Sequence, residues 1–227
     1  MKKLRNIARR IERLFAKPDK SFLSDAGGII HVGANTGQER ELYQHYGLNV
    51  IWIEPIPEVF KVLEDNIRDF PLQKAYQYLV TDENDKQYNF NIANNFGKSS
   101  SILELNQHKD IWPDVKYERE ITLQSIRLPK LLENELIDIK KYNTLIMDTQ
   151  GSELLVLKGA NNVLKHFKYI KTEVCDFESY TGCCQLDGIN QFLGENGFKP
   201  YSKDLFATRE GGGSYYDVTY INNYYSK

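Results

Sequence analysis

Short apolar runs that end abruptly in small or acidic residues recur along the chain, and segments of helical periodicity separate them. The first run, residues 29–32, is followed by Gly33, Asn35 and Gly37, and residues 42–46 then repeat apolar positions at helical spacing. This order predicts a strand, a tight turn and a helix. Such a turn directs backbone N–H groups toward a ligand above the strand, and glycines allow that ligand to come close. We therefore expect a nucleotide-like ligand here.

A second apolar run at residues 50–53 predicts a strand buried on both faces, which ends at Glu54 and Pro55. Glu54 follows Gly33 by 21 residues. In a strand–helix–strand unit, an acidic residue at about this distance accepts hydrogen bonds from the hydroxyl groups of a ribose. The alternative interpretation is a solvated glutamate in an ordinary loop.

The next segments continue this alternation. Pro57 suits a first helical turn, and the helical pattern that follows ends before Pro71. Residues 74–80 predict a third strand of the sheet, which ends at the polar pair Thr81 and Asp82. That pair is equally typical of a simple turn at the end of a strand.

A long interval, about residues 83–142, precedes the next buried run. It contains two strand-like stretches, residues 87–92 and 119–127, and a polar loop at residues 94–101 that includes Ser100. Because long excursions in compact domains are often binding elements, we expect an inserted segment on the substrate side. The loop either contacts substrate or cofactor or is merely solvated. The interval also holds His108, Trp112 and Asp114, which we interpret as structural or surface residues.

The fourth strand, predicted at residues 144–147, ends at Asp148. Ser152 suits the N-cap of the helix that follows. Because strands beside the switch point of a doubly wound sheet converge at their carboxyl ends, we expect Asp148 to face the same crevice as Gly33 and Glu54. The alternative is a carboxylate that only caps the next helix. A fifth strand at residues 169–174 carries Glu173 near its end.

The last part of the chain predicts one helix and two strands. Apolar positions between Leu186 and Leu193 repeat at helical spacing, and Gly197 ends the helix. Residues 198–206 and 215–221 then favour two strands of an antiparallel hairpin, joined through three consecutive glycines. We expect the tyrosines of the final strand to pack along an edge of the sheet.

Length, charge and cysteine usage limit the class of protein. The chain has 227 residues, enough for one sizeable core, and a formal net charge of −2 with both signs mixed. We therefore expect no basic surface for nucleic acid. Cys175, Cys183 and Cys184 lack the spacing of a zinc site or a disulfide framework. No apolar run suits a membrane span or a signal peptide, which predicts a soluble, cytoplasmic protein with reduced thiols.

The first 25 residues differ from the rest in composition. Basic residues surround an apolar stripe at helical spacing within residues 1–17, which predicts an amphipathic helix. It could lie on an anionic membrane surface or cover the active site, but a helix that packs one face on the domain explains the pattern more simply. We predict an N-terminal unit, residues 1–25, and a single domain, residues 26–227.

The longest motif in the chain is Asp148-Thr149-Gln150-Gly151-Ser152-Glu153, continued by residues 154–160. It resembles the signature D-x-[EQ]-G-x-E-x-x-x-L-K-G-A of FkbM-type methyltransferases, a family of class I S-adenosylmethionine-dependent methyltransferases. The turn at residues 31–37 resembles the opening loop of that family, in which Asp is commoner than His at the position of His31. Further matches at residues 99–101, 172–173, 196–198 and 217–222 extend the similarity over roughly residues 28–223.

This resemblance implies a three-layer α/β/α, Rossmann-like fold with a mostly parallel seven-stranded sheet and an antiparallel last strand. It also implies S-adenosyl-L-methionine (SAM) as cofactor and O-methylation of a sugar, a polyketide or another small metabolite. The mixed charge already disfavours a nucleic-acid partner. Thr81 and Asp82 would meet the adenine amino group. The residues then expected to bind the cofactor are His31, Gly33, Asn35, Gly37, Glu54, Pro55, Thr81, Asp82, Ser100, Asp148 and Gln150.

At the first of these positions, a neutral His31 can accept a hydrogen bond from a cofactor amino group but brings no fixed negative charge. His31 could equally be a core residue at the strand end. Methyl transfer to a hydroxyl group needs aligned reactants and a base that removes the proton, for which Asp148 and Glu173 are the candidates. No spaced ligand cluster demands a metal, although a divalent ion on Asp148 and a neighbouring carboxylate stays open.

Two functions of other classes also stay open. One is an NAD-dependent oxidoreductase, which the absence of the third glycine of G-x-G-x-x-G disfavours. The other is a non-catalytic module that binds a nucleoside without turnover.

Overall fold

A computed structural model of the chain describes residues 21–225; residues 1–17, for which a basic helix is predicted, lie outside this range. The strands of the main sheet are β1 (Gly28–Val32), β2 (Asn49–Ile53), β3 (Gln73–Tyr76), β7 (Thr144–Met147), β8 (Tyr169–Cys175), β9 (Phe198–Thr208) and β10 (Ser214–Asn222). The α-helices are α2 (Arg40–His45), α3 (Pro57–Ile67), α4 (Leu128–Asn134), α5 (Glu153–Gly159) and α6 (Leu186–Glu195). Short 3-10 turns complete the described chain, among them η1 (Ser21–Asp25) and η2 (Gln107–Asp110).

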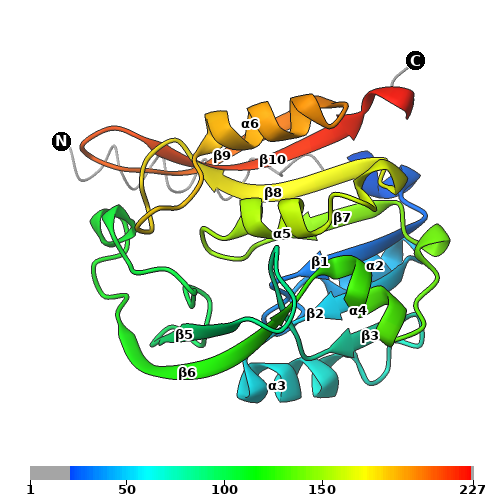
Figure 1. Cartoon of the computed structure of the whole chain (residues 1–227), viewed down its shortest axis with the longest axis horizontal. Helices are drawn as coiled ribbons and strands as arrows, with labels where there is room; N and C mark the ends of the chain where they lie inside the picture. Colours follow the sequence, from blue (N-terminus) through cyan, green and yellow to red (C-terminus); the bar gives the residue numbers. More distant parts are fainter. Residues whose placement is uncertain (1–20, 226–227) are drawn as a thin grey trace.

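The main sheet has the strand order β3-β2-β1-β7-β8-β10-β9 (Figure 1). Strand β1 pairs in parallel with both β2 and β7, so the chain runs outward through β2 and β3 and then returns to the other side of β1. The carboxyl ends of β1 and β7 therefore flank the topological switch point, where ligands bind in open α/β sheets. This order confirms the predicted seven-stranded, mostly parallel architecture.

The last strand, β10, lies between β8 and β9 and is antiparallel to both. The predicted antiparallel last strand is thus confirmed, but the expectation that its tyrosines pack along an edge is wrong. The edge strand is β9. The side chains of Tyr215 and Tyr220 on β10 are buried.

Alternating side chains on the central strands build one core on each face of the sheet. Ile30 and Val32 of β1 belong to a cluster that includes residues of α4, α5 and α6. Ile29 of β1 belongs to a second cluster that includes residues of η1, α2 and α3. The central strands are therefore buried on both faces, and each fully buried Ile or Val contributes roughly 1.5–3 kcal/mol. Helices thus cover both faces of the sheet and give three layers.

The segment between β3 and β7 forms a second, smaller sheet beside the main one. It contains β4 (Leu79–Val80), β5 (Gln87–Ala93) and β6 (Tyr117–Ile126) in the order β4-β6-β5. Strands β5 and β6 are antiparallel, and η2 lies in the connection between them. Helix α4, at the end of this interval, packs into the main core.

The third strand differs from the prediction. Strand β3 ends at Tyr76, and residues 79–80 leave the main sheet to pair with β6 as β4. Thr81 is buried where its carbonyl oxygen approaches Gly159 at the end of α5, so closely that a Cβ on this glycine would lie 2.1 Å away. The turn at Thr81 and Asp82 is therefore not the carboxyl end of a strand in the main sheet.

Candidate active site

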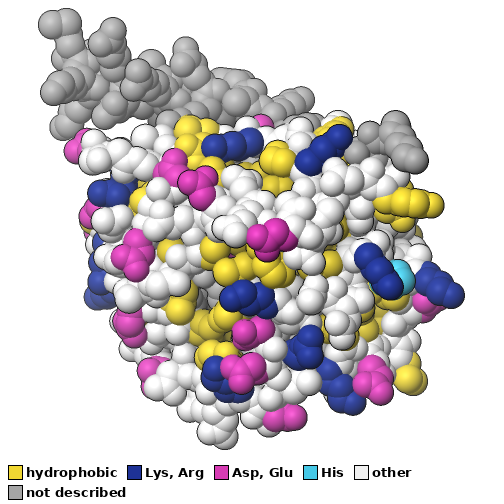
Figure 2. Space-filling view, turned by 45° about the horizontal axis from the view of Figure 1, so that its top comes forward, with side chains coloured by type: hydrophobic (Ala, Val, Ile, Leu, Met, Phe, Trp, Pro, Cys, Tyr) yellow, Lys and Arg dark blue, Asp and Glu magenta, His cyan; other side chains and the backbone are white. Residues whose placement is uncertain are grey.

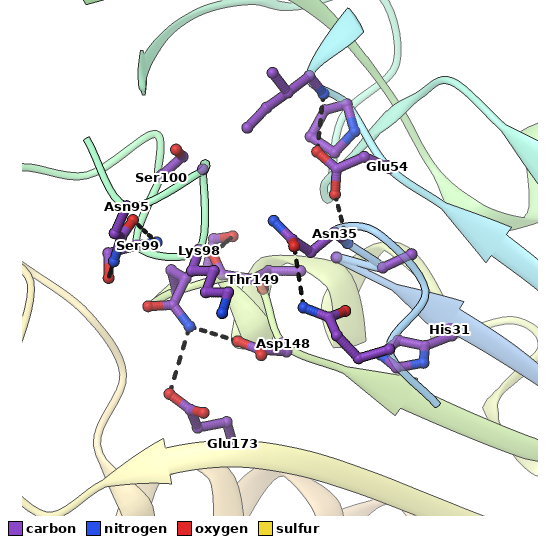
Figure 3. Close-up of a pocket in the computed structure, with 18 of the residues that line it drawn as sticks. His31, Asn35, Glu54, Asn95, Lys98, Ser99, Ser100, Asp148, Thr149 and Glu173 are labelled. Carbon is purple, nitrogen blue, oxygen red and sulfur yellow. Dashed lines mark hydrogen bonds between the residues drawn. The ribbon is translucent and has the colours of Figure 1, made fainter. Parts of the chain in front are cut away.

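A cavity of about 390 Å³ lies at the carboxyl ends of β1, β2, β7 and β8, with the loop after β5 over it (Figure 3). Nine of the predicted site residues line it, namely His31, Gly33, Asn35, Glu54, Pro55, Ser100, Asp148, Gln150 and Glu173. The volume falls in the range typical of small-molecule sites. The expectation that Asp148 faces the same crevice as Gly33 and Glu54 is therefore met by the geometry.

Gly33 allows the ends of β1 and β7 to come together. Its φ angle is 79°, and a Cβ built on it would lie 1.9 Å from the carbonyl oxygen of Asp148. The backbone N–H of Asp148 donates in turn to the carbonyl of Val32 at 3.0 Å. Only glycine satisfies both the positive φ and the close approach, so the turn places the Asp148 backbone directly beside the first loop.

Glu54 fixes the shape of that first loop. Its carboxylate accepts hydrogen bonds from the backbone N–H of Asn35 at 2.8 Å and from that of Ile56 at 3.0 Å. Asn35 has a φ of 45°, and its side-chain amide donates to the carbonyl of Phe96 at 3.0 Å, which ties the first loop to the loop after β5. Burial raises the pKa of Glu54 to about 7, although both backbone donors oppose this shift.

Asp148 and Glu173 form a pair that a single amide bridges. The side-chain nitrogen of Gln150 donates to Asp148 at 2.5 Å and to Glu173 at 3.4 Å, while its oxygen accepts from the Tyr180 hydroxyl at 2.6 Å (Figure 3). Gln150 has a φ of 54°, so the backbone adopts an uncommon conformation to deliver this side chain. The three side chains therefore hold a fixed geometry at the edge of the cavity.

The electrostatics of this pair favour retention of a proton. Burial raises the pKa of Asp148 to about 7, with the Glu153 and Asp217 charges adding to the effect. Burial and then the charge of Asp148 raise the pKa of Glu173 well above its usual range. Two neighbouring carboxyl groups rarely ionise together, so near neutral pH the pair retains a proton.

The N-cap residue of the helix after Asp148 makes no capping hydrogen bond. Ser152 occupies the N-cap position of α5, but its hydroxyl donates to the carbonyl of Thr149 instead of accepting from a helix N–H. The buried carboxylate of Glu153 accepts from the backbone N–H groups of Thr149 and Gly151. Since Glu153 satisfies these donors, Asp148 remains available to the cavity and does not serve as the capping carboxylate.

The surroundings of His31 fit the core interpretation. Its ring is buried in an aromatic cluster, stacked on Trp52 with 5.0 Å between ring centroids, and Nδ1 lies 3.3 Å from the Tyr43 hydroxyl. Burial lowers its pKa to about 4, so the imidazole is neutral near pH 7. His31 is thus a core residue at the end of β1, and part of it also lines the cavity.

Three predicted cofactor residues do not line the cavity: Gly37, Thr81 and Asp82. Gly37 is buried beneath α3, and a Cβ there would meet Leu63 at 2.7 Å, so this glycine serves helix packing. Thr81 and Asp82 lie against the end of α5 because the chain leaves the main sheet at Tyr76. The neighbouring β4 residues Leu79 and Val80 line the cavity in their place.

Several lining residues escaped the sequence analysis. His108 and Trp112 reach the cavity from the segment between β5 and β6, and Phe206 reaches it from β9. Lys98, which also lines it, lies in the polar loop for which a ligand contact was predicted. His108 and Trp112 were interpreted as structural or surface residues rather than catalytic ones, and both also line the cavity. The one available signal was the length of the interval that carries them.

Carboxylates dominate the charge of the cavity. Four acidic residues line it, namely Glu39, Glu54, Asp148 and Glu173. Lys98 is the only Lys or Arg among the described residues that line it. The described residues contain no group of three or more His, Cys, Asp or Glu side chains arranged to hold a metal ion. This arrangement suits an organic cation with hydroxyl groups, since carboxylates accept hydrogen bonds from hydroxyls and attract positive charge.

Comparison with known proteins gives a family and a fold. The family model described as "Methyltransferase FkbM domain" matches residues 31–200. A search of curated proteins returned no significant match. Within residues 21–225, no helix has the length and apolarity that crossing a lipid bilayer requires.

Solved structures that superpose on this chain with a TM-score of at least 0.50 share its fold. The methyltransferase domain of METTL16 superposes with a TM-score of 0.51 at 12% identity and covers 86% of this chain and 59% of its own. Sp1610 from Streptococcus pneumoniae, assigned as a tRNA (m1A22) methyltransferase, gives 0.50 at 9% identity over 89% of this chain and 68% of its own. Magnesium protoporphyrin IX methyltransferase from Synechocystis, with bound SAM, gives 0.48 at 9% identity over 86% of this chain and 69% of its own.

Proposed function

The chain belongs to the family of proteins with a methyltransferase FkbM domain, and on this premise we propose that it is a SAM-dependent O-methyltransferase of a sugar or another small metabolite. The observation that carries the proposal is that Gly33, Glu54 and Asp148, from three different strand ends, line one cavity at the switch point of the sheet.

The residues present fit a nucleoside with a cationic tail. Each oxygen of Glu54 already accepts one backbone hydrogen bond, and a carboxylate oxygen has capacity for a second, so Glu54 can accept from both ribose hydroxyls. Leu79, Val80 and Ile56 offer an apolar surface for a base beside it. Gly33 and Asn35 would hold the sugar side of the ligand, and Gln38 and Thr149 offer polar groups to the amino-acid tail.

Glu54 and Asp148, which form no ion pair with a described residue, favour a positively charged ligand. Burial keeps the pKa of both Glu54 and Asp148 near 7, so a cation placed between them would favour their ionised forms. SAM supplies a methyl group on a positively charged sulfur, which makes that carbon open to attack by a nucleophile. Lys98, on the loop that crosses the cavity, is free to meet an anionic group of a ligand, because none of the described residues forms an ion pair with it.

The Asp148–Glu173 pair supplies the base in this proposal. An acceptor hydroxyl within reach of the pair would lose its proton to whichever carboxylate is ionised, and Gln150 holds both carboxyl groups in place. A carboxyl pKa near 7 suits a base that works at neutral pH, because the group is ionised often enough and still binds a proton well. The protein otherwise aligns the reactants and excludes water.

We propose that the methyl acceptor is a small molecule in the cytoplasm and not a nucleic acid. On the face in Figure 2, basic and acidic side chains are interspersed without a basic patch of the kind that binds phosphates. The acidic cavity would also repel a phosphodiester chain.

The proposal is tested by calorimetric titration of S-adenosylhomocysteine (SAH) and NAD⁺, followed by transfer of labelled methyl groups from SAM to a panel of glycosides and hydroxylated metabolites. We expect SAH to bind, NAD⁺ to bind far more weakly, and label to appear on an acceptor oxygen. Tight binding of NAD⁺ without SAH binding would instead assign an oxidoreductase. Binding of SAH without transfer to any acceptor would indicate the non-catalytic module.

A further inference from the structure

One end of the cavity is walled by aromatic side chains that the cofactor proposal does not use. His108 and Trp112 come from the connection between β5 and β6, and Phe206 comes from β9. All three rings contact Tyr215, which pairs with Cys175 on β8, two residues beyond Glu173. Glu54 lies on the opposite side of the cavity from Glu173 (Figure 3). This end therefore offers a second compartment beside the cofactor residues.

The position of Trp112 is fixed by its neighbours. Its ring centroid lies 4.6 Å from that of His108 and 5.3 Å from that of Tyr215, and the indole is half-buried where it lines the cavity. Tyr215 also contacts the ring of Phe206 at 5.5 Å. Because these rings pack together in one apolar cluster, Trp112 presents a rigid aromatic surface, which costs little conformational entropy when a ligand binds.

His108 holds this wall in place and carries no charge there. Its Nδ1 lies 2.7 Å from the Tyr215 hydroxyl and its Nε2 lies 3.1 Å from the Ser99 hydroxyl, which also accepts from the Asn95 amide at 2.9 Å. The side chain is buried, and burial lowers its pKa to about 4. Since both ring nitrogens have partners, His108 acts as a positioning residue that links the loop after β5 to β10.

The chemistry of this end selects a class of ligand. A flat indole binds the apolar face of a ring, and the carboxyl groups of Asp148 and Glu173 accept hydrogen bonds from hydroxyl groups at its edge. A pyranose ring presents both features. A nucleobase within a polynucleotide would bring phosphates into a cavity whose described lining carries four acidic residues against Lys98.

We propose that this compartment is the acceptor subsite for a pyranose unit, which stacks on Trp112 and directs one hydroxyl at the Asp148–Glu173 pair. The inference rests on the proposed function and deepens it by naming the residue that selects the acceptor. Trp112 is the specificity-determining residue, and His108, Ser99 and Tyr215 keep it in position.

The two tryptophans of the chain make the test direct. Trp52 is fully buried beneath His31, so Trp112 is the tryptophan that a ligand in the cavity can contact. Methyl glycopyranosides and nucleosides are titrated separately into the protein, with and without SAH, while tryptophan emission and saturation-transfer NMR are recorded. Trp112→Ala and Trp112→Phe are compared with Phe96→Ala. Phe96 is an aromatic control in the same connection between β5 and β6; it is 87% exposed and does not line the cavity.

We expect at least one glycopyranoside to shift the emission of Trp112. Trp112→Ala should weaken binding of that glycopyranoside by about tenfold, because a stacking contact contributes about this much to the affinity. Trp112→Phe should weaken it by less than about threefold, and Phe96→Ala should leave it unchanged. SAH affinity should stay within about twofold in all variants.

Equal glycoside affinity in Trp112→Ala, a response to nucleosides but not to glycosides, or no response from any glycoside would overturn the subsite. If the wild-type protein does not bind SAH, the proposed function is overturned, independently of the result for the acceptor subsite. Glycoside titration without SAH still decides whether Trp112 receives a sugar in that case.

Discussion

The carbonyl oxygen of Asp148 lies so close to Gly33 that a Cβ on this glycine would come within 1.9 Å of it. Two strand ends that are far apart in the sequence are thereby held in van der Waals contact at the switch point of the sheet. The cavity exists in its observed shape because the side chain at position 33 is a hydrogen atom.

Gly33→Ala is therefore expected to destabilise the fold by about 3 kcal/mol or more, since it adds both a clash with backbone and a strained positive φ. Gly47→Ala is the matched control, because Gly47 has a similar φ of 65° but open space where its Cβ would lie. It should cost only about 1–2 kcal/mol. Chemical denaturation of both variants measures the difference, and equal losses would show that the contact with Asp148 adds nothing.

Glu54→Gln should weaken SAH binding by about 100-fold, because an amide cannot replace two charge-assisted acceptor contacts at once. The control is Glu64→Gln, an exposed glutamate on α3 whose replacement should leave binding unchanged. Calorimetry gives both affinities. If Glu54→Gln binds SAH as the wild type does, Glu54 is not a ribose contact.

Asp148 should make the ligand-free protein less stable as pH rises. Its pKa is about 7 in the folded state and near 3.8 when unfolded, so the folded state binds the extra proton, and the resulting stability is lost as pH rises through 7. Between pH 6 and pH 8 the wild type should lose about 1.4 kcal/mol relative to Asp148→Asn. Denaturation at the two pH values isolates this contribution as a difference between variants. A pH-independent difference would contradict the raised pKa.

Binding of SAM should release protons for the same reason. A positive sulfur beside Asp148 favours its carboxylate, so near pH 7 SAM binding should release on the order of half a proton, and the uncharged sulfur of SAH should release less. Calorimetry in buffers of different ionisation enthalpy measures the number. Identical proton release by SAM and SAH would place the sulfur away from Asp148.

The base should be distinguishable within the carboxyl pair. Replacing the residue that takes the proton, by Asp148→Asn or Glu173→Gln, should lower turnover about 100-fold or more while SAH affinity changes by less than about threefold. Single-turnover methyl transfer to the acceptor found in the glycoside panel provides the measurement. Equal losses of affinity and turnover in both variants would make the pair a binding site and not a base.

Local sequence patterns were sufficient for the parts of the site that lie at strand ends. The buried runs before Gly33, Glu54 and Asp148 have unambiguous limits, because strands covered on both faces consist of continuous apolar residues, and the parallel order of the sheet then brings their ends together. The same patterns failed at Thr81, where the chain leaves the main sheet after Tyr76 to pair with β6.

The aromatic wall was beyond the reach of such patterns. His108 is held by Tyr215, 107 residues later in the chain, and Phe206 reaches the cavity only because β9 lies beyond β10 at the sheet edge. Contacts of this kind depend on tertiary packing and leave no periodic signal in either segment. Gln150, predicted from the resemblance as a cofactor residue, lines the cavity, but the bridge that its side chain makes between Asp148 and Glu173 was not predicted.

A crystal structure of the protein with SAH tests the central proposal most directly. We predict that the ribose hydroxyls lie within hydrogen-bond distance of the Glu54 carboxylate and that the sulfur faces the Asp148–Glu173 pair. A structure in which SAH binds outside this cavity, or with its ribose turned away from Glu54, would contradict the assignment of the methyl-donor site.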